Sequence, residues 1–282
     1  MARAPEILAI RHQTLLRLTM KQRADSHRRT AAGVAAGLLL LVLPVAAWFA
    51  AKSTSAPPSH MLQASAGAGQ TLQTARGQRL TFALADGSRV TLNTATRVRI
   101  AYSDQERRMT LEDGQAWFEV AKHQSRPFIV QAGGERIEAH GTAFDVRRVA
   151  DRTEVMLAEG KVTVETDRPG RNRASVTMNP NDLVVASITG LTSRHVDNLD
   201  AWGNWRKGIV SFDDTKLGDA VAEMNRYSDT QIEVADAATG RIAVSGTFNA
   251  GATDAFVEAL AIGFKVRASH PGEGRVVLKA AR

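Results

Sequence analysis

The chain has 282 residues, no cysteine and a net charge of +7, with a pI near 10.1. The absence of cysteine excludes disulfides and thiolate metal sites. The basic balance first suggests nucleic acid or an anionic surface as a partner, but seven basic side chains against two acidic ones lie in residues 1–29. The rest of the chain is nearly neutral, which argues against a DNA-binding domain in the C-terminal part.

Residues 30–51 form the first predicted element, an apolar stretch without charge, amide or histidine. A helix of this length spans about 33 Å, enough to cross a hydrocarbon core of about 30 Å. Basic residues precede it and almost none follow, so the positive-inside rule places residues 1–29 in the cytoplasm as a short basic tail. The long apolar run, with Trp48 and Phe49 near its end, favours an uncleaved anchor over a cleaved signal peptide.

The predicted transmembrane helix and the segment after it both contain many small residues. Gly33 and Gly37 have the spacing that lets two helices pack closely, so a homodimer through this helix is one hypothesis. Residues 52–71 are small and polar with a Pro-Pro pair, which predicts a flexible linker. The basic tail itself fits either an anchor for anionic lipid headgroups or a partner-binding peptide.

Residues 72–197 alternate apolar and polar side chains, which predicts strands. Asp86-Gly87 and Asp113-Gly114 are predicted hairpin turns between such runs. Further strands are expected at Phe128–Ala132, Arg136–Ala139, Ala143–Arg147, Glu154–Ala158, Lys161–Glu165, Ser175–Met178 and Leu183–Ser187. The pattern predicts an all-β domain of many short antiparallel strands, a sandwich or a solenoid-like sheet.

Residues 198–282 mix helical and strand patterns, which predicts a small α+β module. A strand at 208–212 precedes a helix that Asp213, Asp214 and Thr215 are expected to cap. Strands are expected at 232–234 and 242–248, a second helix from residue 253 or 254, and closing strands at 264–267 and 275–278. The architecture predicted for the whole chain is therefore a single-pass membrane protein with two domains beyond the membrane.

The sequence contains no recognisable catalytic constellation. The seven histidines are scattered without a metal-binding spacing. Asp213 and Asp214 are neighbours whose side chains face opposite ways on a strand, and a helix cap explains them better than an acid–base pair. No nucleophile elbow or phosphate-binding loop is present. We therefore expect neither an enzyme nor a cofactor or metal site.

Ordered motifs over about 90 residues resemble the FecR family of transmembrane anti-sigma regulators of the ferric-citrate-sensor type. Residues 80–93 read LTFALADGSRVTLN, 114–120 read GQAWFEV, 126–130 read RPFIV, 141–146 read GTAFDV, and 159–162 read EGKV. The C-terminal module is similar to the short N-terminal domain of secretins and TonB-dependent receptors, in the segments WRKG (205–208), FDDTKL (212–217), NRYS (225–228) and VSGTF (244–248).

The resemblance implies a function and two protein partners. In this family a TonB-dependent outer-membrane receptor presents its periplasmic signalling domain to the C-terminal module. The cytoplasmic part then frees or activates an extracytoplasmic-function sigma factor, usually for iron or siderophore uptake genes. The resemblance also implies that the protein lies in the inner membrane, with its large domains in the periplasm. Family members usually carry a longer cytoplasmic domain with tryptophans, whereas 29 residues without tryptophan precede the span here.

The receptor contact is expected on a strand edge or helix face of residues 198–282, because strand addition supplies main-chain hydrogen bonds without a catalytic site. The candidate contact residues are Trp202, Trp205, Phe212, Leu217, Val221 and Met224. The last four also fit a buried core, whereas the tryptophans suit the surface better. The alternative function is an inner-membrane tether that binds an envelope component without sigma-factor control, and the short tail favours it.

Overall fold

The computed structural model describes residues 65–66, 69–122, 125–166, 173–197 and 202–281. Residues 59–282 form one compact unit of the chain. The predicted tail, the predicted membrane segment with Gly33 and Gly37, and most of the linker therefore lie outside the described residues. Within the described ranges, no helix is long and apolar enough to cross a membrane.

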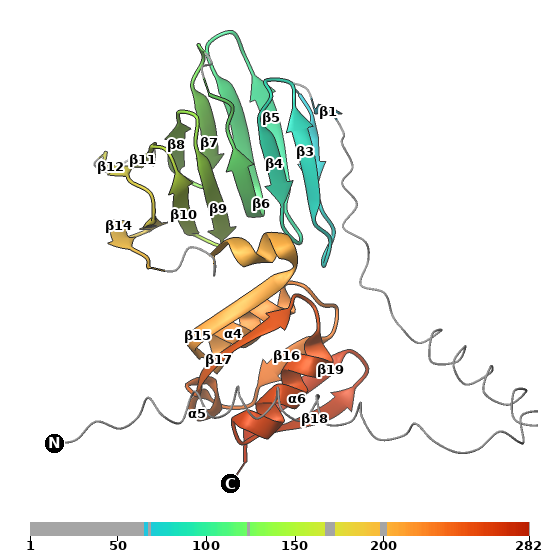
Figure 1. The fold of residues 1–282 in the computed structure, drawn as a ribbon. Coiled ribbons are helices and arrows are strands. Elements are labelled where there is room, and N and C mark those ends of the chain that lie inside the picture. The colour runs from blue at the N-terminus through green and yellow to red at the C-terminus, as the bar shows by residue number, and fades with distance from the viewer. Residues whose placement is uncertain (1–64, 67–68, 123–124, 167–172, 198–201, 282) are drawn as a thin grey trace, which may run out of the picture. The chain divides into compact units, whose positions relative to one another are not determined.

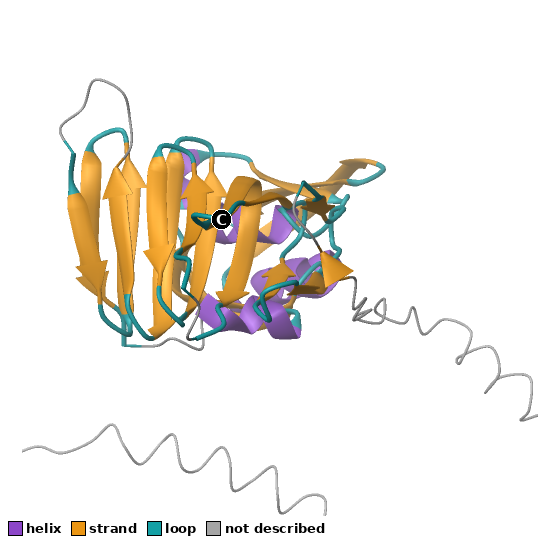
Figure 2. Cartoon of the chain, turned by 90° about the horizontal axis from the view of Figure 1, so that it is seen from above, coloured by secondary structure: helices purple, strands orange, loops and turns teal. Residues whose placement is uncertain are grey.

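Residues 65–197 form the β domain, in which strands run side by side in two layers (Figures 1 and 2). The strands are β1 (Ser65–Ala66), β2 (Thr71–Gln73), β3 (Leu80–Leu84), β4 (Arg89–Leu92), β5 (Arg97–Tyr102), β6 (Arg107–Glu119), β7 (Phe128–Ala132), β8 (Glu135–Ala139), β9 (Ala143–Val149), β10 (Arg152–Glu159), β11 (Val162–Thr166), β12 (Ser175–Met178), β13 (Asp182–Ser187) and β14 (Gly190–His195). Their main order is β12-β11-β8-β7-β6-β9-β10-β13-β14. Strands β4 and β5 also pair with β6, β3 pairs with β4 and β1, and β2 pairs with β5.

Strand β6 joins the two layers. Its first half pairs with β5 and β7, and its second half pairs with β4 and β9. The pairing register with β5 shifts between Arg97 and Val98, which marks a β-bulge on β6 next to Asp113-Gly114. A bulge bends a strand sharply, so one strand can pass from one sheet to the other.

The hairpin predicted at Asp113-Gly114 is therefore wrong, because the pair lies inside β6. Gly114 has φ +91°, and a Cβ there would clash with Thr96 Oγ1. A glycine with positive φ is used by some strand irregularities, such as G1 bulges, as well as by hairpin turns, so the dipeptide signal is shared by both. The Asp86-Gly87 turn between β3 and β4 is confirmed, with Leu84 N–H donating to the Ser88 carbonyl at 2.8 Å.

Most strand pairs are antiparallel, as predicted, but β1–β3 and β6–β7 are parallel. The core lies between the layers. Phe118 on β6 stacks on Phe144 of β9, with ring centroids 5.1 Å apart, and meets Phe128 of β7 edge-on at 6.0 Å. At one side of the core, the Arg107 guanidinium lies 2.6 Å from the Asp86 carboxylate, and both side chains are almost fully buried.

The C-terminal module, residues 202–281, contains the helices drawn in purple in Figure 2. Its elements are the 3₁₀ helix η1 (Asn204–Lys207), β15 (Ile209–Lys216), α4 (Leu217–Asn225), β16 (Gln231–Val234), α5 (Ala237–Gly240), β17 (Ala243–Asn249), α6 (Thr253–Gly263), β18 (Val266–Gly272) and β19 (Arg275–Ala280). Strands β15 and β17 form one antiparallel sheet, and β16, β19 and β18 form another in that order. The predicted α+β module is thus present.

The predicted cap of the first helix is wrong. Helix α4 follows Lys216, whose side chain makes no capping hydrogen bond, whereas Asp213, Asp214 and Thr215 lie in β15. Thr215 and Lys216 still pair with β17 after a register shift, so the strand continues to the start of the helix. Asp214, with φ +45°, bends the strand at this irregularity.

Candidate functional site

The structure places the predicted contact residues of the module mostly in its interior. Phe212, Leu217, Val221 and Met224 belong to the module core, which also contains Phe256 and Leu260. This burial follows from the i, i+4, i+7 spacing along α4, which turns one face of the helix inward.

The two tryptophans differ in exposure. Trp202 is half-buried. Trp205 is only 5% exposed, so the expectation that it suits the surface is wrong. It is buried because its indole contacts a side chain of the β domain.

Trp205 lies on η1 and donates a hydrogen bond from Nε1 to Asp145 Oδ2 on β9, at 3.0 Å. The other carboxylate oxygen of Asp145 accepts from Gln115 Nε2 of β6, at 2.8 Å. Asp145 stands opposite Trp117 of β6 in register, on the face of the sheet that points away from the Phe118–Phe144 stack. The module therefore contacts the outward face of this sheet.

A second part of the contact runs from Gln115 to the end of α4. Asn93 Nδ2 donates to Gln115 Oε1 at 2.9 Å and lies 2.8 Å from the Tyr227 hydroxyl. Thr94 Oγ1 donates to the Arg226 carbonyl at 2.8 Å. These bonds fix the chain just after α4 against the loop between β4 and β5.

The third part is ionic. Arg226 Nη1 lies 2.7 Å from Glu223 Oε1, and Arg147 Nη2 of β9 lies 2.7 Å from Glu223 Oε2. The Tyr227 hydroxyl donates to Glu223 Oε1 at 3.2 Å. The Glu223 carboxylate thus lies between a guanidinium of its own helix end and one of the β domain.

We call this set of side chains the interdomain network. Its members are Asn93, Gln115, Asp145 and Arg147 of the β domain and Trp205, Glu223, Arg226 and Tyr227 of the module. At its margin, Arg79 donates to the Trp205 carbonyl at 2.7 Å, and the Arg206 guanidinium lies over the Trp117 ring at 3.8 Å. Sequence patterns missed Asn93, Gln115 and Asp145, although Gln115 and Asp145 are polar residues between apolar neighbours on predicted strands.

Burial raises the pKa of Asp145 to about 7. The hydrogen bonds from Gln115 and Trp205 and the nearby Arg147 and Arg226 guanidinium groups act in the opposite direction. The carboxyl is fully buried, and removing a carboxylate from water disfavours its charged form. Asp145 therefore changes its charge near neutral pH while it holds the two domains together.

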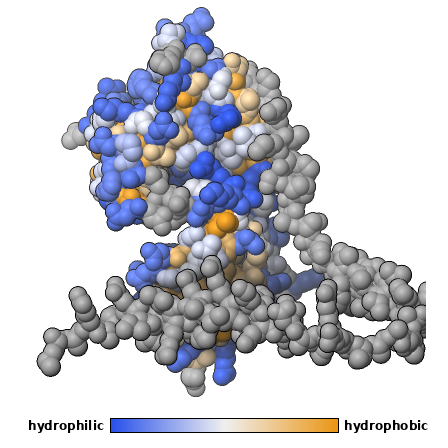
Figure 3. Space-filling model, in the orientation of Figure 1, coloured by the Kyte–Doolittle hydropathy of each residue, from blue (hydrophilic) through white to orange (hydrophobic). Residues whose placement is uncertain are grey.

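The module also offers open strand edges within the described residues. Strands β15 and β17 pair only with each other there, and β16 and β18 each pair only with β19. An unpaired edge presents main-chain donors and acceptors that a partner strand can use. Figure 3 shows a mixed, mostly hydrophilic face, and the large apolar side chains exposed in the described part are Val149, Ile188 and Ile262.

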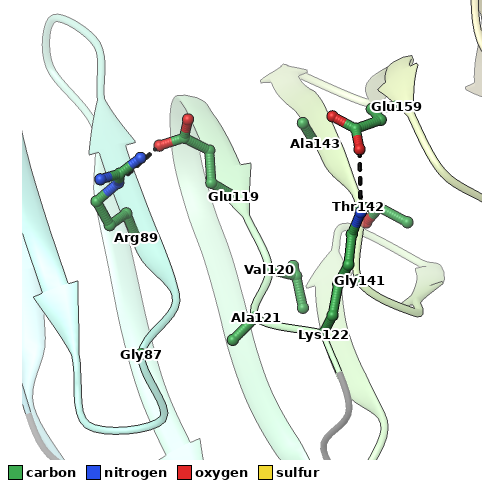
Figure 4. Close-up of a pocket in the computed structure, with 10 residues that line it drawn as sticks. All are labelled: Gly87, Arg89, Glu119, Val120, Ala121, Lys122, Gly141, Thr142, Ala143 and Glu159. Atoms are coloured by element: carbon green, nitrogen blue, oxygen red, sulfur yellow. Dashed lines mark hydrogen bonds and ion pairs between the residues drawn. The ribbon is translucent and has the colours of Figure 1, made fainter.

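A shallow groove of about 350 Å³ lies on the β domain where β6 ends and the turns before β4, β9 and β11 meet (Figure 4). Two ion pairs line it, Arg89–Glu119 at 3.0 Å and Lys122–Glu159 at 3.2 Å. All four charged side chains are more than a third exposed, so each ion pair contributes little to stability. The described residues contain no group of three or more metal-binding side chains, in this groove or elsewhere.

Comparison with known proteins gives a family for part of the chain. Residues 70–163 match the family model described as FecR protein. None of the curated proteins matches the chain.

Two crystal structures of a putative anti-sigma factor from Parabacteroides distasonis ATCC 8503, at 1.65 and 2.50 Å resolution, have the same fold. Their TM-scores are 0.65 and 0.64, with 20% and 21% identity. Each comparison covers 76% of this chain, and 100% and 99% of the other chains.

Proposed function

The chain carries a FecR domain, and from this premise we propose that it is a transmembrane anti-sigma regulator. It relays a periplasmic signal from a TonB-dependent outer-membrane receptor to an extracytoplasmic-function sigma factor, for iron or siderophore uptake genes. The observation that carries the proposal is the match of residues 70–163 to the FecR family. The fold shared with the Parabacteroides protein, over that protein's full length, supports it.

On the cytoplasmic side, residues 1–29 contact the sigma factor. The test is co-purification of an extracytoplasmic-function sigma factor with the full chain and with a chain lacking residues 2–29. We expect capture by the full chain only. A chain lacking residues 198–282 is the control, and it should still capture the sigma factor. If the full chain captures none, the protein is a tether without sigma-factor control.

On the periplasmic side, the receptor's signalling domain adds a strand to an open edge of the C-terminal module. Trp202 contributes a side-chain contact, while Phe212, Leu217, Val221 and Met224 support the surface from the core, and Trp205 supports it from the interdomain contact. The test is hydrogen exchange of the full chain with and without the receptor's signalling domain. We expect new protection in β15, β17, β16 or β18. Protection confined to the β domain would contradict this docking site.

In the membrane, residues 30–51 anchor the protein in the bacterial inner membrane, with the N-terminus inside. Alkaline phosphatase fused after residue 282 should be active, and the same enzyme fused after residue 29 should be inactive. Gly33 and Gly37 pack two copies into a homodimer. Replacing both glycines with isoleucine should abolish cross-linking between copies, and unchanged cross-linking would contradict packing through this pair.

A further inference from the structure

The contact between the FecR domain and the C-terminal module is polar, and the two hydrophobic cores remain separate. The core of the FecR domain ends with Val184, the core of the module begins at Val210, and they share no residue. Within the described residues, Tyr227 is the one member of the module core that this contact also uses, through its hydroxyl. A contact between two separately packed cores can therefore open with little loss of core packing. Such interfaces within a chain resemble transient protein–protein contacts, for which relative motion is the default.

The charges of the interdomain network are balanced on each side of the contact. Asp145 and Arg147 lie on one strand of the FecR domain, and Glu223 and Arg226 lie at the end of α4. Opening the contact therefore leaves one acid and one base of the network on each surface. The margin of the contact adds one positive charge to each surface, from Arg79 and Arg206. Because water would solvate both pairs again, the Coulomb attraction lost on opening is largely offset.

The network is also incompletely satisfied in the closed arrangement. Arg147 Nε and Arg226 Nη2 are buried and have no hydrogen-bond partner among the described residues. A buried donor without a partner costs free energy that water would return on opening. Both carboxylate oxygens of Asp145 and Glu223 Oε1 accept hydrogen bonds from defined donors, whereas Glu223 Oε2 has only the ion-pair contact with Arg147 Nη2 among the described residues. The geometry is thus specific, while its net stabilisation is small.

We propose that the interdomain network is a two-state contact, with a docked form and an undocked form in which both domains stay folded. Engagement of the module by its partner shifts the population toward the undocked form. The existence of the two states depends on the contacts described above, and only their use in signalling rests on the proposed function.

Three small substitutions should each weaken the docked form at a different point of the contact. Trp205→Phe removes the N–H that binds Asp145 and keeps an aromatic ring. Glu223→Gln removes the anion between Arg147 and Arg226. Gly77→Ala places a Cβ 3.0 Å from the Tyr227 carbonyl oxygen, so it presses on the backbone after α4 and changes no side chain of the interdomain network.

Each variant has a matched control outside the network. Trp202→Phe is the control for the tryptophan, and Glu258→Gln on the exposed side of α6 is the control for the carboxylate. Gly69→Ala is the control for the glycine. Gly69 has φ +83° against +72° for Gly77, so both alanines suffer backbone strain, but a Cβ at position 69 would meet nothing within 4 Å.

The experiment measures the distance between spin labels on the two domains of the full chain by pulsed electron resonance. The chain has no cysteine, so Ser193→Cys on β14 and Ala255→Cys on α6, both exposed, give specific labelling. The unmodified background, which is the chain that carries only the two labelling cysteines, should give one dominant distance between the labels. Trp205→Phe and Glu223→Gln should each raise the ratio of undocked to docked molecules roughly ten- to a hundredfold, the effect of losing one hydrogen bond to a charged group. Gly77→Ala should raise the same ratio through its steric contact with the Tyr227 carbonyl oxygen.

Hydrogen exchange of β7 and β19 reports whether each domain stays folded in the same samples. A longer distance with both strands still protected supports the two-state contact. An unchanged distance in all three variants, or loss of protection in β19 whenever the distance grows, would overturn it. This measurement needs neither sigma factor nor receptor, so its failure is distinct from a failure of the proposed function.

Discussion

Domain docking should weaken as the pH rises toward neutrality, because Asp145 is buried only in the docked form. Burial raises the pKa of this carboxyl to about 7 from an ordinary value of 3.8. Undocking exposes the group to water and returns its pKa to the ordinary range. Between these two values the docked form holds a proton that the undocked form has released. The proton-linked stabilisation of docking is therefore complete below pH 3.8 and lost once the pH exceeds about 7.

The two pKa values set the magnitude. Their difference corresponds to about 4 kcal/mol of docking free energy at about 1.4 kcal/mol for each pH unit. The ratio of undocked to docked molecules should thus rise by up to about tenfold for each unit between pH 5 and 7, and level off above. The other charged groups of the network that face this contact are Glu223, Arg147 and Arg226.

The assay is the distance between labels at residues 193 and 255, recorded from pH 5 to 8. Asp145→Asn should remove the pH dependence, because the amide does not titrate. Asp254→Asn on the exposed start of α6 is the control and should keep it. A ratio that stays constant with pH in the unmodified background, or one that still changes with pH in Asp145→Asn, would refute the reasoning.

Two further predictions concern the stability of the folded domains, measured by urea unfolding. Asp86→Ala should lower the free energy of unfolding by about 3–5 kcal/mol, because it leaves the Arg107 guanidinium buried without its counter-charge; Glu233→Ala, which breaks an ion pair at the same 2.6 Å on the surface, should produce no measurable change. Gly114→Ala should cost about 1–3 kcal/mol or more, since it adds a steric clash to positive-φ strain. Gly274→Ala, with φ +69° and open space around it, should cost less. Equal effects within either pair would contradict these assignments.

The sequence predicted the strands well because each depends on local alternation. Leu80, Phe82 and Leu84 alternate with polar neighbours and lie in the core, and the Asp86-Gly87 turn follows from two residues alone. Asp113-Gly114 shows the limit of such local signals. The same dipeptide serves a bulge inside β6, and only the pairing of that strand with four others distinguishes the two cases. The predicted cap at residues 213–215 failed for the same reason, since pairing with β17 extends the strand.

The interdomain network could not be predicted, because its members come from segments far apart in the chain. Asn93, Asp145 and Tyr227 lie in three separate segments that resemble the FecR family or its C-terminal module, and no local pattern links one segment to another. Their common role appears only when folding brings β4, β9 and the end of α4 together. Trp205 is the clearest case. An aromatic residue in a short loop-like segment is expected at the surface, but its N–H donates to the buried carboxylate of Asp145, 60 positions earlier in the chain.

Five of the six residues predicted to contact a partner are buried, and this burial restricts where a partner can bind the module. Phe212, Leu217, Val221 and Met224 are needed for its core, and Trp205 is needed for docking, so a partner that binds the docked form meets mainly strand edges and Trp202. Recognition through main-chain hydrogen bonds then gives affinity, and it gives little side-chain specificity. The face of α4 that carries Glu223 and the adjoining Tyr227 would supply specific side-chain contacts only after undocking. Domain opening would therefore add specificity to an edge contact that is otherwise permissive, and a partner able to bind both surfaces would favour the undocked form by that additional affinity.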